Sequence, residues 1–111
     1  MKLIIAIVRD EDSSRVVNKL MKEGFSVTKL ATTGGFLRAG NTTLLLGVDD
    51  DKVRVALDVI EHVCKSRKQL AAAPAAVTSV PGGFGATTYP VEVTVGGATV
   101  FVLTVDQFVK L

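Results

Sequence analysis

The hydrophobic positions near the start of the chain follow first a strand pattern and then a helix pattern. Residues 3–8 form a continuous aliphatic run bounded by charge, which predicts a central strand buried on both faces. The apolar residues within 16–21 then recur at helical spacing, the acids and serines of 10–14 offer N-cap oxygens, and Gly24 is a typical helix stop. The pattern therefore predicts one strand followed directly by one amphipathic helix.

The next part of the chain contains two further strands and a second helix. Residues 25–31 and 42–48 have strand patterns, and the glycines between them predict a loop over 32–41. The acidic run 49–51 suits the positive N-terminus of a helix, whose apolar stripe falls within 53–64.

The last part of the chain changes in composition and then returns to strand patterns. Residues 66–88 are rich in Ala, Gly, Pro, Ser and Thr and predict a long flexible loop, a feature that is usually functional in a compact domain. Apolar runs predict strands over 89–95 and 98–105, and Gly96-Gly97 has the form of a two-residue hairpin turn between them.

The order of these elements is β-α-β-β-α-β with an additional C-terminal strand. This order is typical of the α+β, ferredoxin-like arrangement, in which an antiparallel sheet carries two helices on one face. The length of 111 residues fits a single domain over 1–111. Because nothing within one chain covers the other face of such a sheet, we expect symmetric self-association.

Charge and cysteine content exclude several classes of function. The formal net charge is +2 and only residues 65–68 form a basic cluster, which a helix end explains, so we expect no nucleic-acid partner. Cys64 is the only cysteine, which excludes an internal disulfide and favours inert packing. The apolar residues 1–8 are too short to span a membrane and lack a signal-peptide cleavage site, so we expect a cytoplasmic protein without membrane contact.

Catalytic and metal-binding patterns are nearly absent from the sequence. His62 is the only histidine and is expected on the exposed side of the second helix, and one His with one Cys does not make a zinc site within one chain. An acylphosphatase-like hydrolase would need a phosphate-cradling loop directly after the first strand, where this chain has the acids of 10–12. These features argue against an enzyme and against a metal.

One loop does carry the residue types of a nucleotide site. The glycine pair 34–35 frees the backbone to turn its N–H groups toward an anion. Phe36 and Leu37 would offer an apolar plate for a flat ring, Arg38 a positive charge, and Asn41 an amide that matches the edge of an adenine. Alternatively, the glycine pair is only a turn and Phe36 a core anchor, and the spacing alone does not decide between the two.

The sequence also resembles a known family. Residues 28–43, TKLATTGGFLRAGNTT, are similar to the signature of the PII-like cyclic di-AMP receptors, as are KLIIAIV over 2–8, YPVEV over 89–93 and VGGATVFV over 95–102. Residues 66–88 match least well. The resemblance implies a homotrimer of PII-like, ferredoxin-like protomers that binds cyclic di-AMP at three subunit clefts, without catalysis and without a cofactor.

The resemblance further implies which residues contact the ligand. The glycine pair would meet the phosphates, Asn41 an adenine, and Phe36 and Leu37 would pack on the base. Phe101 would add an apolar contact from a neighbouring protomer. The residues implied for the site are Thr28, Gly34, Gly35, Phe36, Leu37, Asn41, Gly47 and Phe101.

The chain departs from the family pattern close to this site. Relatives commonly carry an Arg where this chain has Ser26, and they often end with a Gln near the position of Lys110. Arg38 or Lys29 is a candidate to replace the missing charge. Ser26, Arg38 and Lys110 are therefore kept as possible ligand contacts.

Three functions remain open besides the hydrolase. The first is a cyclic di-AMP receptor whose loops, chiefly 66–88 and 38–40, change order on binding and signal to an unidentified protein partner. The second is a sensor of ATP, ADP or another adenine nucleotide on the same scaffold. The third is a ligand-free adaptor in which Phe36 and Leu37 anchor a protein.

Overall fold

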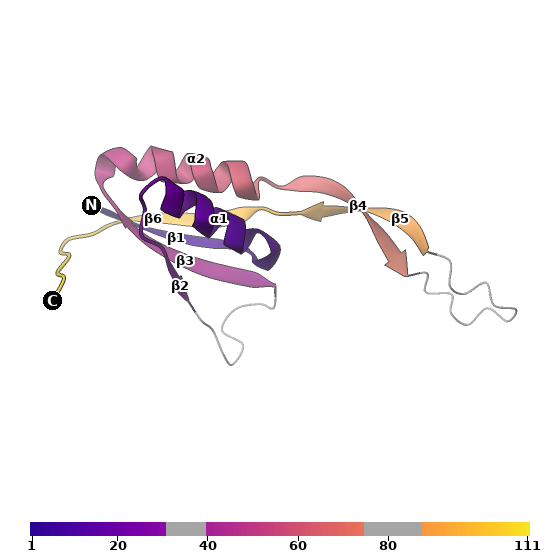
Figure 1. Ribbon diagram of the computed structural model, residues 1–111, viewed down its shortest axis with the longest axis horizontal. Helices are drawn as coiled ribbons and strands as arrows, with labels where there is room; N and C mark the ends of the chain where they lie inside the picture. Colours follow the sequence, from indigo (N-terminus) through magenta and orange to yellow (C-terminus); the bar gives the residue numbers. More distant parts are fainter. Residues whose placement is uncertain (31–39, 75–87) are drawn as a thin grey trace, which may run out of the picture.

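The computed structural model describes residues 1–30, 40–74 and 88–111, which form a sheet with two helices and a separate two-stranded ribbon (Figure 1). The elements in chain order are β1 (Lys2–Arg9), α1 (Asp10–Lys22), β2 (Thr28–Leu30), β3 (Asn41–Val48), the 3-10 turn η1 (Asp50–Lys52), α2 (Val53–Cys64), β4 (Arg67–Pro74), β5 (Thr88–Val95) and β6 (Ala98–Thr104). Among the described residues, no helix is long and apolar enough to cross a membrane.

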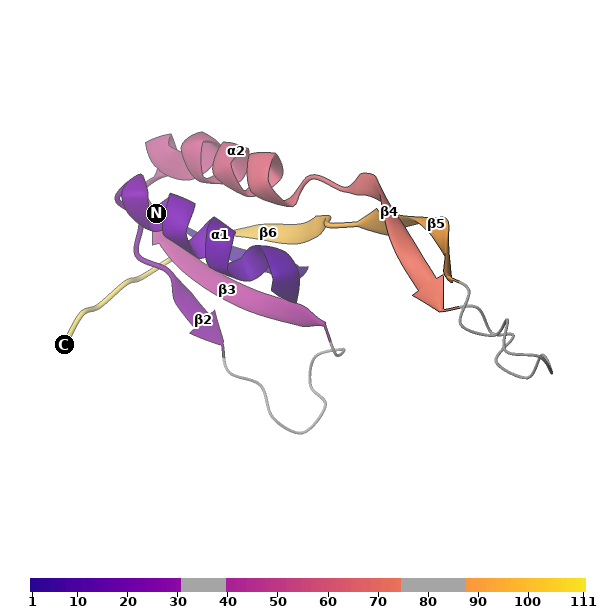
Figure 2. The ribbon, with the colours of Figure 1, turned by 45° about the vertical axis from the view of Figure 1, so that its right-hand side comes forward.

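The four-stranded sheet has the order β2-β3-β1-β6, and each pair of neighbours is antiparallel. Both helices lie on the same face of this sheet (Figure 2). The predicted ferredoxin-like fold is confirmed, and β6 is the C-terminal strand that completes the sheet. Strand β2 is shorter than predicted, because only Thr28–Leu30 pairs with β3.

The core lies between the central strands and the helices. Ile4, Ala6 and Val8 of β1 are fully or almost fully buried because alternate strand residues point to the helical face. The odd-numbered residues 3–7 point away from the helices and stay partly exposed, so the predicted burial of this strand on both faces is wrong for the single chain. The rest of the core comes from Val16, Leu20, Leu44, Leu46, Val48, Ala56, Ile60, Val63 and Cys64. Each large aliphatic residue buried there contributes about 1.5–3 kcal/mol.

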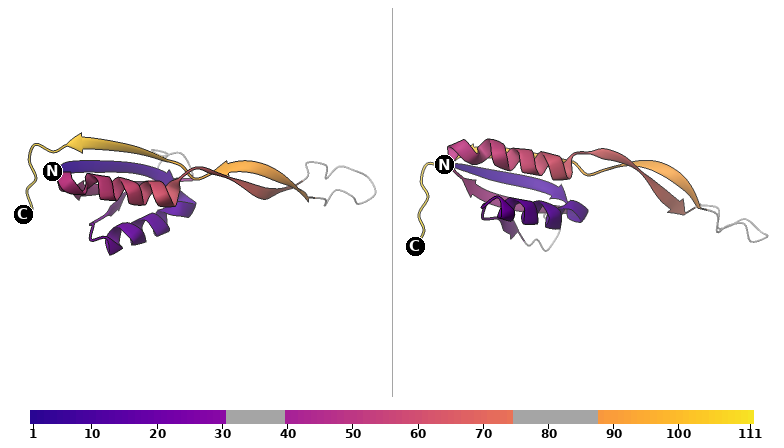
Figure 3. Two further views of the ribbon diagram at one scale, coloured as in Figure 1. Left: turned by 90° about the horizontal axis from the view of Figure 1, so that it is seen from above. Right: turned by 45° about the horizontal axis from the view of Figure 1, so that its top comes forward.

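Strands β4 and β5 form a ribbon that projects beyond the helices and the sheet (Figure 3). Their pairing runs from Arg67 opposite Val95 to Pro74 opposite Thr88. The prediction of a loop over 66–88 is therefore wrong for residues 67–74. Residues 75–87 lie outside the described part of the chain, and the flexibility expected of this segment stays a prediction.

Gly96 and Gly97 join the ribbon to the sheet. Both have positive φ, 80° and 92°, but the predicted hairpin turn is wrong because β5 pairs with β4 while β6 pairs with β1. The Gly97 N–H donates to the Cys64 carbonyl, and a Cβ on Gly96 would lie 2.9 Å from the Lys65 carbonyl oxygen. The chain thus passes the end of α2 too closely for a side chain at Gly96.

Helix α1 begins where β1 ends, with Arg9 at the N-cap position and no capping side chain. The predicted capping by the acids and serines of 10–14 is therefore wrong. Asp10 instead ties the start of α1 to the start of β3: its N–H donates to the Gly40 carbonyl at 2.8 Å, and its carboxylate accepts a hydrogen bond from the Thr42 hydroxyl. The predicted stop at Gly24 is confirmed, since its φ of 91° follows directly on the end of the helix.

Candidate functional site

The sheet face opposite the helices, which we call the open face, holds four of the predicted site residues, Thr28, Asn41, Gly47 and Phe101. Strand pairing places Thr28, Leu45, Ile5 and Phe101 in one row across the four strands. Gly47 belongs to the next row toward the end of β3. The side chains of one row point to the same face, because side chains alternate along each strand and neighbouring strands are in register.

The open face spreads these residues over a broad area. Asn41 and Gly47 are six residues apart in β3, which corresponds to about 20 Å along a strand. Thr28 and Phe101 lie on the two edge strands, three strand spacings or about 14 Å apart. Within one chain they therefore line a surface with Thr28 and Phe101 at opposite edges, and not a closed pocket.

The described strand positions of the open face are largely apolar and include no acid. Phe101 and Leu103 are 51% and 47% exposed, and exposed apolar surface of this kind marks an interaction site. Among its described strand positions there is no carboxylate, so nothing on these strands repels a phosphate. These positions are Leu3, Ile5, Ile7, Arg9, Thr28, Leu30, Asn41, Thr43, Leu45, Gly47, Thr99, Phe101 and Leu103.

A pocket of about 370 Å³ at the end of β3 brings Ser26 together with Gly47. This volume falls in the range of ligand pockets, roughly 300–1,000 Å³. The pocket contains one cation, Lys52, and two acids, Glu23 and Asp49, and its other lining residues are Met1, Gly24, Phe25 and Val48. Ser26 thus lines the same pocket as Gly47, at the position where relatives commonly carry an Arg.

The other predicted site residues are not tested by the described residues, apart from Lys110. Gly34, Gly35, Phe36, Leu37 and Arg38 lie outside the described residues, so their predicted roles are untested. Lys110 is exposed in the extended segment that follows β6.

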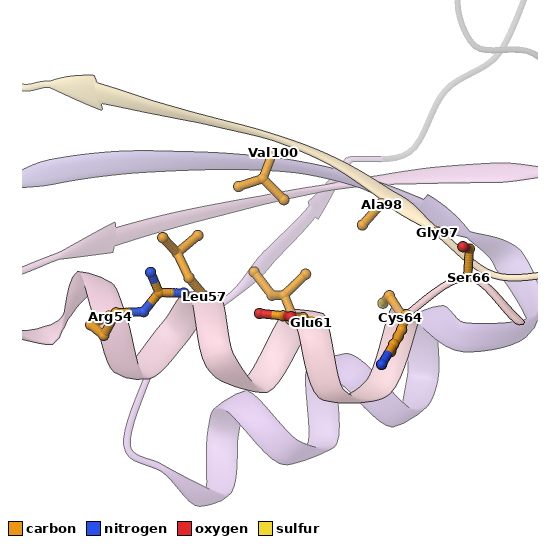
Figure 4. A pocket seen from close by; sticks show the side chains of 10 residues that line it. Arg54, Leu57, Glu61, Cys64, Ser66, Gly97, Ala98 and Val100 are labelled. Carbon is orange, nitrogen blue, oxygen red and sulfur yellow. The ribbon is translucent and has the colours of Figure 1, made fainter.

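Sequence reasoning missed a second pocket, of about 410 Å³, between α2 and β6. Leu57 points from α2 toward Val100 of β6, and Cys64 lies at the end of the pocket near Ala98 (Figure 4). Burial, and after it the nearby Asp12 carboxylate, raise the pKa of the Cys64 thiol from 9.0 to about 11. The thiol therefore stays protonated near neutral pH, and the predicted inert packing of Cys64 fits its burial.

The titratable groups elsewhere do not form a catalytic cluster in the described part of the chain. His62 is exposed, as predicted, and Asp58 one turn away pairs with Arg54 at 3.0 Å. No group of three His, Cys, Asp or Glu side chains is placed to hold a metal ion within residues 1–30, 40–74 and 88–111.

A buried carboxylate at the root of the ribbon was also missed. Asp12 is fully buried, and its Oδ1 accepts hydrogen bonds from Arg15 at 2.5 Å and from Arg67 at 3.2 Å. Its Oδ2 has no hydrogen-bond partner among the described residues. The i,i+3 spacing to Arg15 is visible in the sequence, whereas Arg67 is 55 residues away and gives no local signal.

The ferredoxin-like sheet, its open face and the ribbon inserted before β6 together define a small PII-like protein. Comparison with known families then gives the family itself. The whole chain, residues 1–111, matches the family described as cyclic-di-AMP receptor, and it belongs to that family. It is also similar to the crystal structure of a functionally unknown protein from Pediococcus pentosaceus ATCC 25745. The two are 38% identical with a TM-score of 0.76, over 99% of this chain and 96% of that chain.

Proposed function

We propose that this chain is a non-enzymatic receptor that binds cyclic di-AMP between the subunits of a homotrimer. Family membership supports the ligand. The observation that carries the proposal is the open face, where Thr28, Asn41, Gly47 and Phe101 share one largely apolar surface whose described strand positions include no acid. A cyclic dinucleotide offers flat bases for such a surface and phosphates that no carboxylate of these strands opposes.

The positions of Thr28 and Phe101 support a site shared between protomers. These residues lie on opposite edge strands, about 14 Å apart, so one ligand contacts both most readily when the β6 edge of one protomer meets the β2 edge of another. Such an assembly would also cover the exposed side chains of Phe101 and Leu103. The homotrimer implied by the resemblance is the simplest closed form of this contact.

Signalling in this proposal is conformational. Binding changes the order of loops near the site, with residues 66–88 and 38–40 as the first candidates, and a protein partner recognises the changed surface. The two-stranded part of 67–74 and 88–95 gives the first of these segments a fixed root. Catalysis has no part in it, since a receptor needs only a difference in affinity between two states.

Isothermal titration calorimetry at micromolar protein tests the ligand. We expect binding of one cyclic di-AMP per protomer and much weaker or no binding of cyclic di-GMP, ATP and ADP. If ATP or ADP binds saturably and cyclic di-AMP does not bind, the ligand is an adenine mononucleotide instead. Ser26 in place of the usual Arg is the departure from the family pattern that would explain such a change of ligand. Absence of heat with all four would overturn the proposal.

A further inference from the structure

A groove runs between α1 and α2 on the outer side of the helical layer, away from the open face. Its central part, about 390 Å³, is lined by Arg15, Asn18, Lys19, Lys22, His62 and Val63. It continues at one end past Lys65 and Arg67, and at the other past Val55 and Val59. The two sets of basic residues are some forty positions apart in the chain, so the sequence alone does not show that they meet.

The groove carries more positive charge than its own contacts balance. Asp12 accepts hydrogen bonds from the two arginines of the groove, Arg15 and Arg67. The positive charge of the lysines is not balanced in this way. Within the described residues, Lys19, Lys22 and Lys65 form no ion pair. Lysines at a helix C-terminus favour the helix dipole, but the dipole does not account for their succession along one groove, with Lys19 and Lys22 lining its central part and Lys65 the adjoining end.

Acidic residues at the far end of the groove restrict the kind of ligand that can bind along it. Glu23 and Asp58 lie beside Val55 and Val59 there, so a long uniform polyanion such as nucleic acid, or an anionic membrane, would meet repulsion along part of its length. Apolar side chains, among them Val63, form part of the floor. The chemistry that matches is a short segment with acids opposite the lysines and apolar residues opposite the valines.

We propose that this interhelical groove docks a short, acidic, amphipathic segment of a partner protein. Helix α2 has 12 residues and is about 18 Å long, which matches a partner helix of similar length or about five to six extended residues. This docking does not rest on nucleotide binding, because the groove and the open face lie on opposite sides of the sheet. The groove is thereby available to a partner whether or not the open face is occupied.

Fluorescence anisotropy with a synthetic peptide tests the proposal. The probe is a labelled helical peptide with glutamates on one face and leucines on the other, and its matched control has glutamine at each glutamate. The wild-type protein is expected to bind the acidic peptide in the micromolar range and the glutamine peptide at least about tenfold more weakly. Lys19→Glu should weaken binding of the acidic peptide by at least about tenfold.

The matched protein control is Lys68→Glu, which makes the same charge change on β4 outside the groove. It should alter binding by less than about twofold. Equal weakening by both variants would overturn the proposal in favour of non-specific charge attraction. The proposal would also be overturned if adding the acidic peptide changed the NMR chemical shifts of Phe101 and the open face and not those of Lys19, His62 and Val63. A single-stranded oligonucleotide or phosphatidylserine vesicles could instead bind more tightly than the acidic peptide and in a Lys19-dependent way. The partner of the groove would then be a nucleic acid or a membrane, and the proposal of a protein segment would be wrong.

Discussion

Replacing Arg15 and Arg67 together by alanine is expected to lower the free energy of unfolding by about 3–5 kcal/mol. Both guanidinium groups donate to Oδ1 of Asp12, which is fully buried. Without them a buried carboxylate loses its hydrogen-bonded partners, which is the costly way to break a buried pair. Urea unfolding at fixed protomer concentration measures the change, since assembly makes apparent stability depend on concentration.

The same cluster supplies the control for this prediction. Each single arginine variant should cost less than half of the double variant, because the remaining guanidinium still pairs with Asp12. Adding Asp12→Asn to the double variant should recover part of the loss, since it removes the uncompensated charge. Arg54→Ala, which breaks only the exposed pair with Asp58, should cost about 0.3–0.5 kcal/mol. A double variant no less stable than Arg54→Ala would contradict this account of Asp12.

Ser26→Arg is expected to raise the affinity for cyclic di-AMP by about tenfold to a hundredfold, on the basis of the proposed function. Ser26 lines the pocket that contains Gly47, at the end of the open face. A charge-assisted hydrogen bond to a phosphate contributes about 1.5–3 kcal/mol, which is roughly one to two decades of affinity. Calorimetry with the wild-type protein and the variant measures the gain directly.

Ser26→Gln is the matched control, because it adds length and hydrogen-bonding capacity without charge. It should change the affinity by less than about threefold. Two acids line the same pocket, Glu23 and Asp49, and could form ion pairs with the new arginine. If the new arginine pairs with them, affinity stays at the wild-type value, and the pocket at Ser26 is not where the phosphates lie.

The fold could be predicted where local periodicity carries the information. The strands at 3–8 and 42–48 follow from apolar runs and both helices from helical apolar spacing, and the structure confirms these four elements but not the burial of the first strand on both faces. Strand β4 could not be predicted, because the run RKQLAAAP of 67–74 has no strand pattern and is held by pairing with β5. The hairpin at Gly96-Gly97 was wrong for a related reason: β6 pairs with β1, almost a hundred residues away, and a local turn signal does not reveal that contact.

The candidate site was predictable only in part. Asn41 was predicted from its residue type and its place in the loop, and Thr28, Gly47 and Phe101 from the resemblance. The strand register places all four at open-face positions. No local pattern indicates this, because a shared face depends on the pairing of four strands. The pairing of Asp12 with Arg67 was unpredictable for the same reason. In the sequence Asp12 is one of several acids at the start of a helix, and only the fold places Arg67 of the ribbon beside it.

A mixed assembly tests most directly whether cyclic di-AMP binds on the open face between two protomers. Thr28→Asp adds a carboxylate that repels an anionic ligand at the β2 edge, and Phe101→Ala removes the aromatic side chain at the β6 edge. Each variant alone is expected to lose at least about tenfold in affinity, with sedimentation confirming that the assembly is retained.

Coexpression of the two variants with different tags, followed by tandem purification, isolates the mixed assemblies. If the site joins Thr28 of one protomer to Phe101 of the next, each mixed trimer regains one intact site, and calorimetry shows binding at wild-type affinity with about one third of the wild-type stoichiometry. Mixed assemblies that bind cyclic di-AMP no better than either variant alone would contradict the shared site.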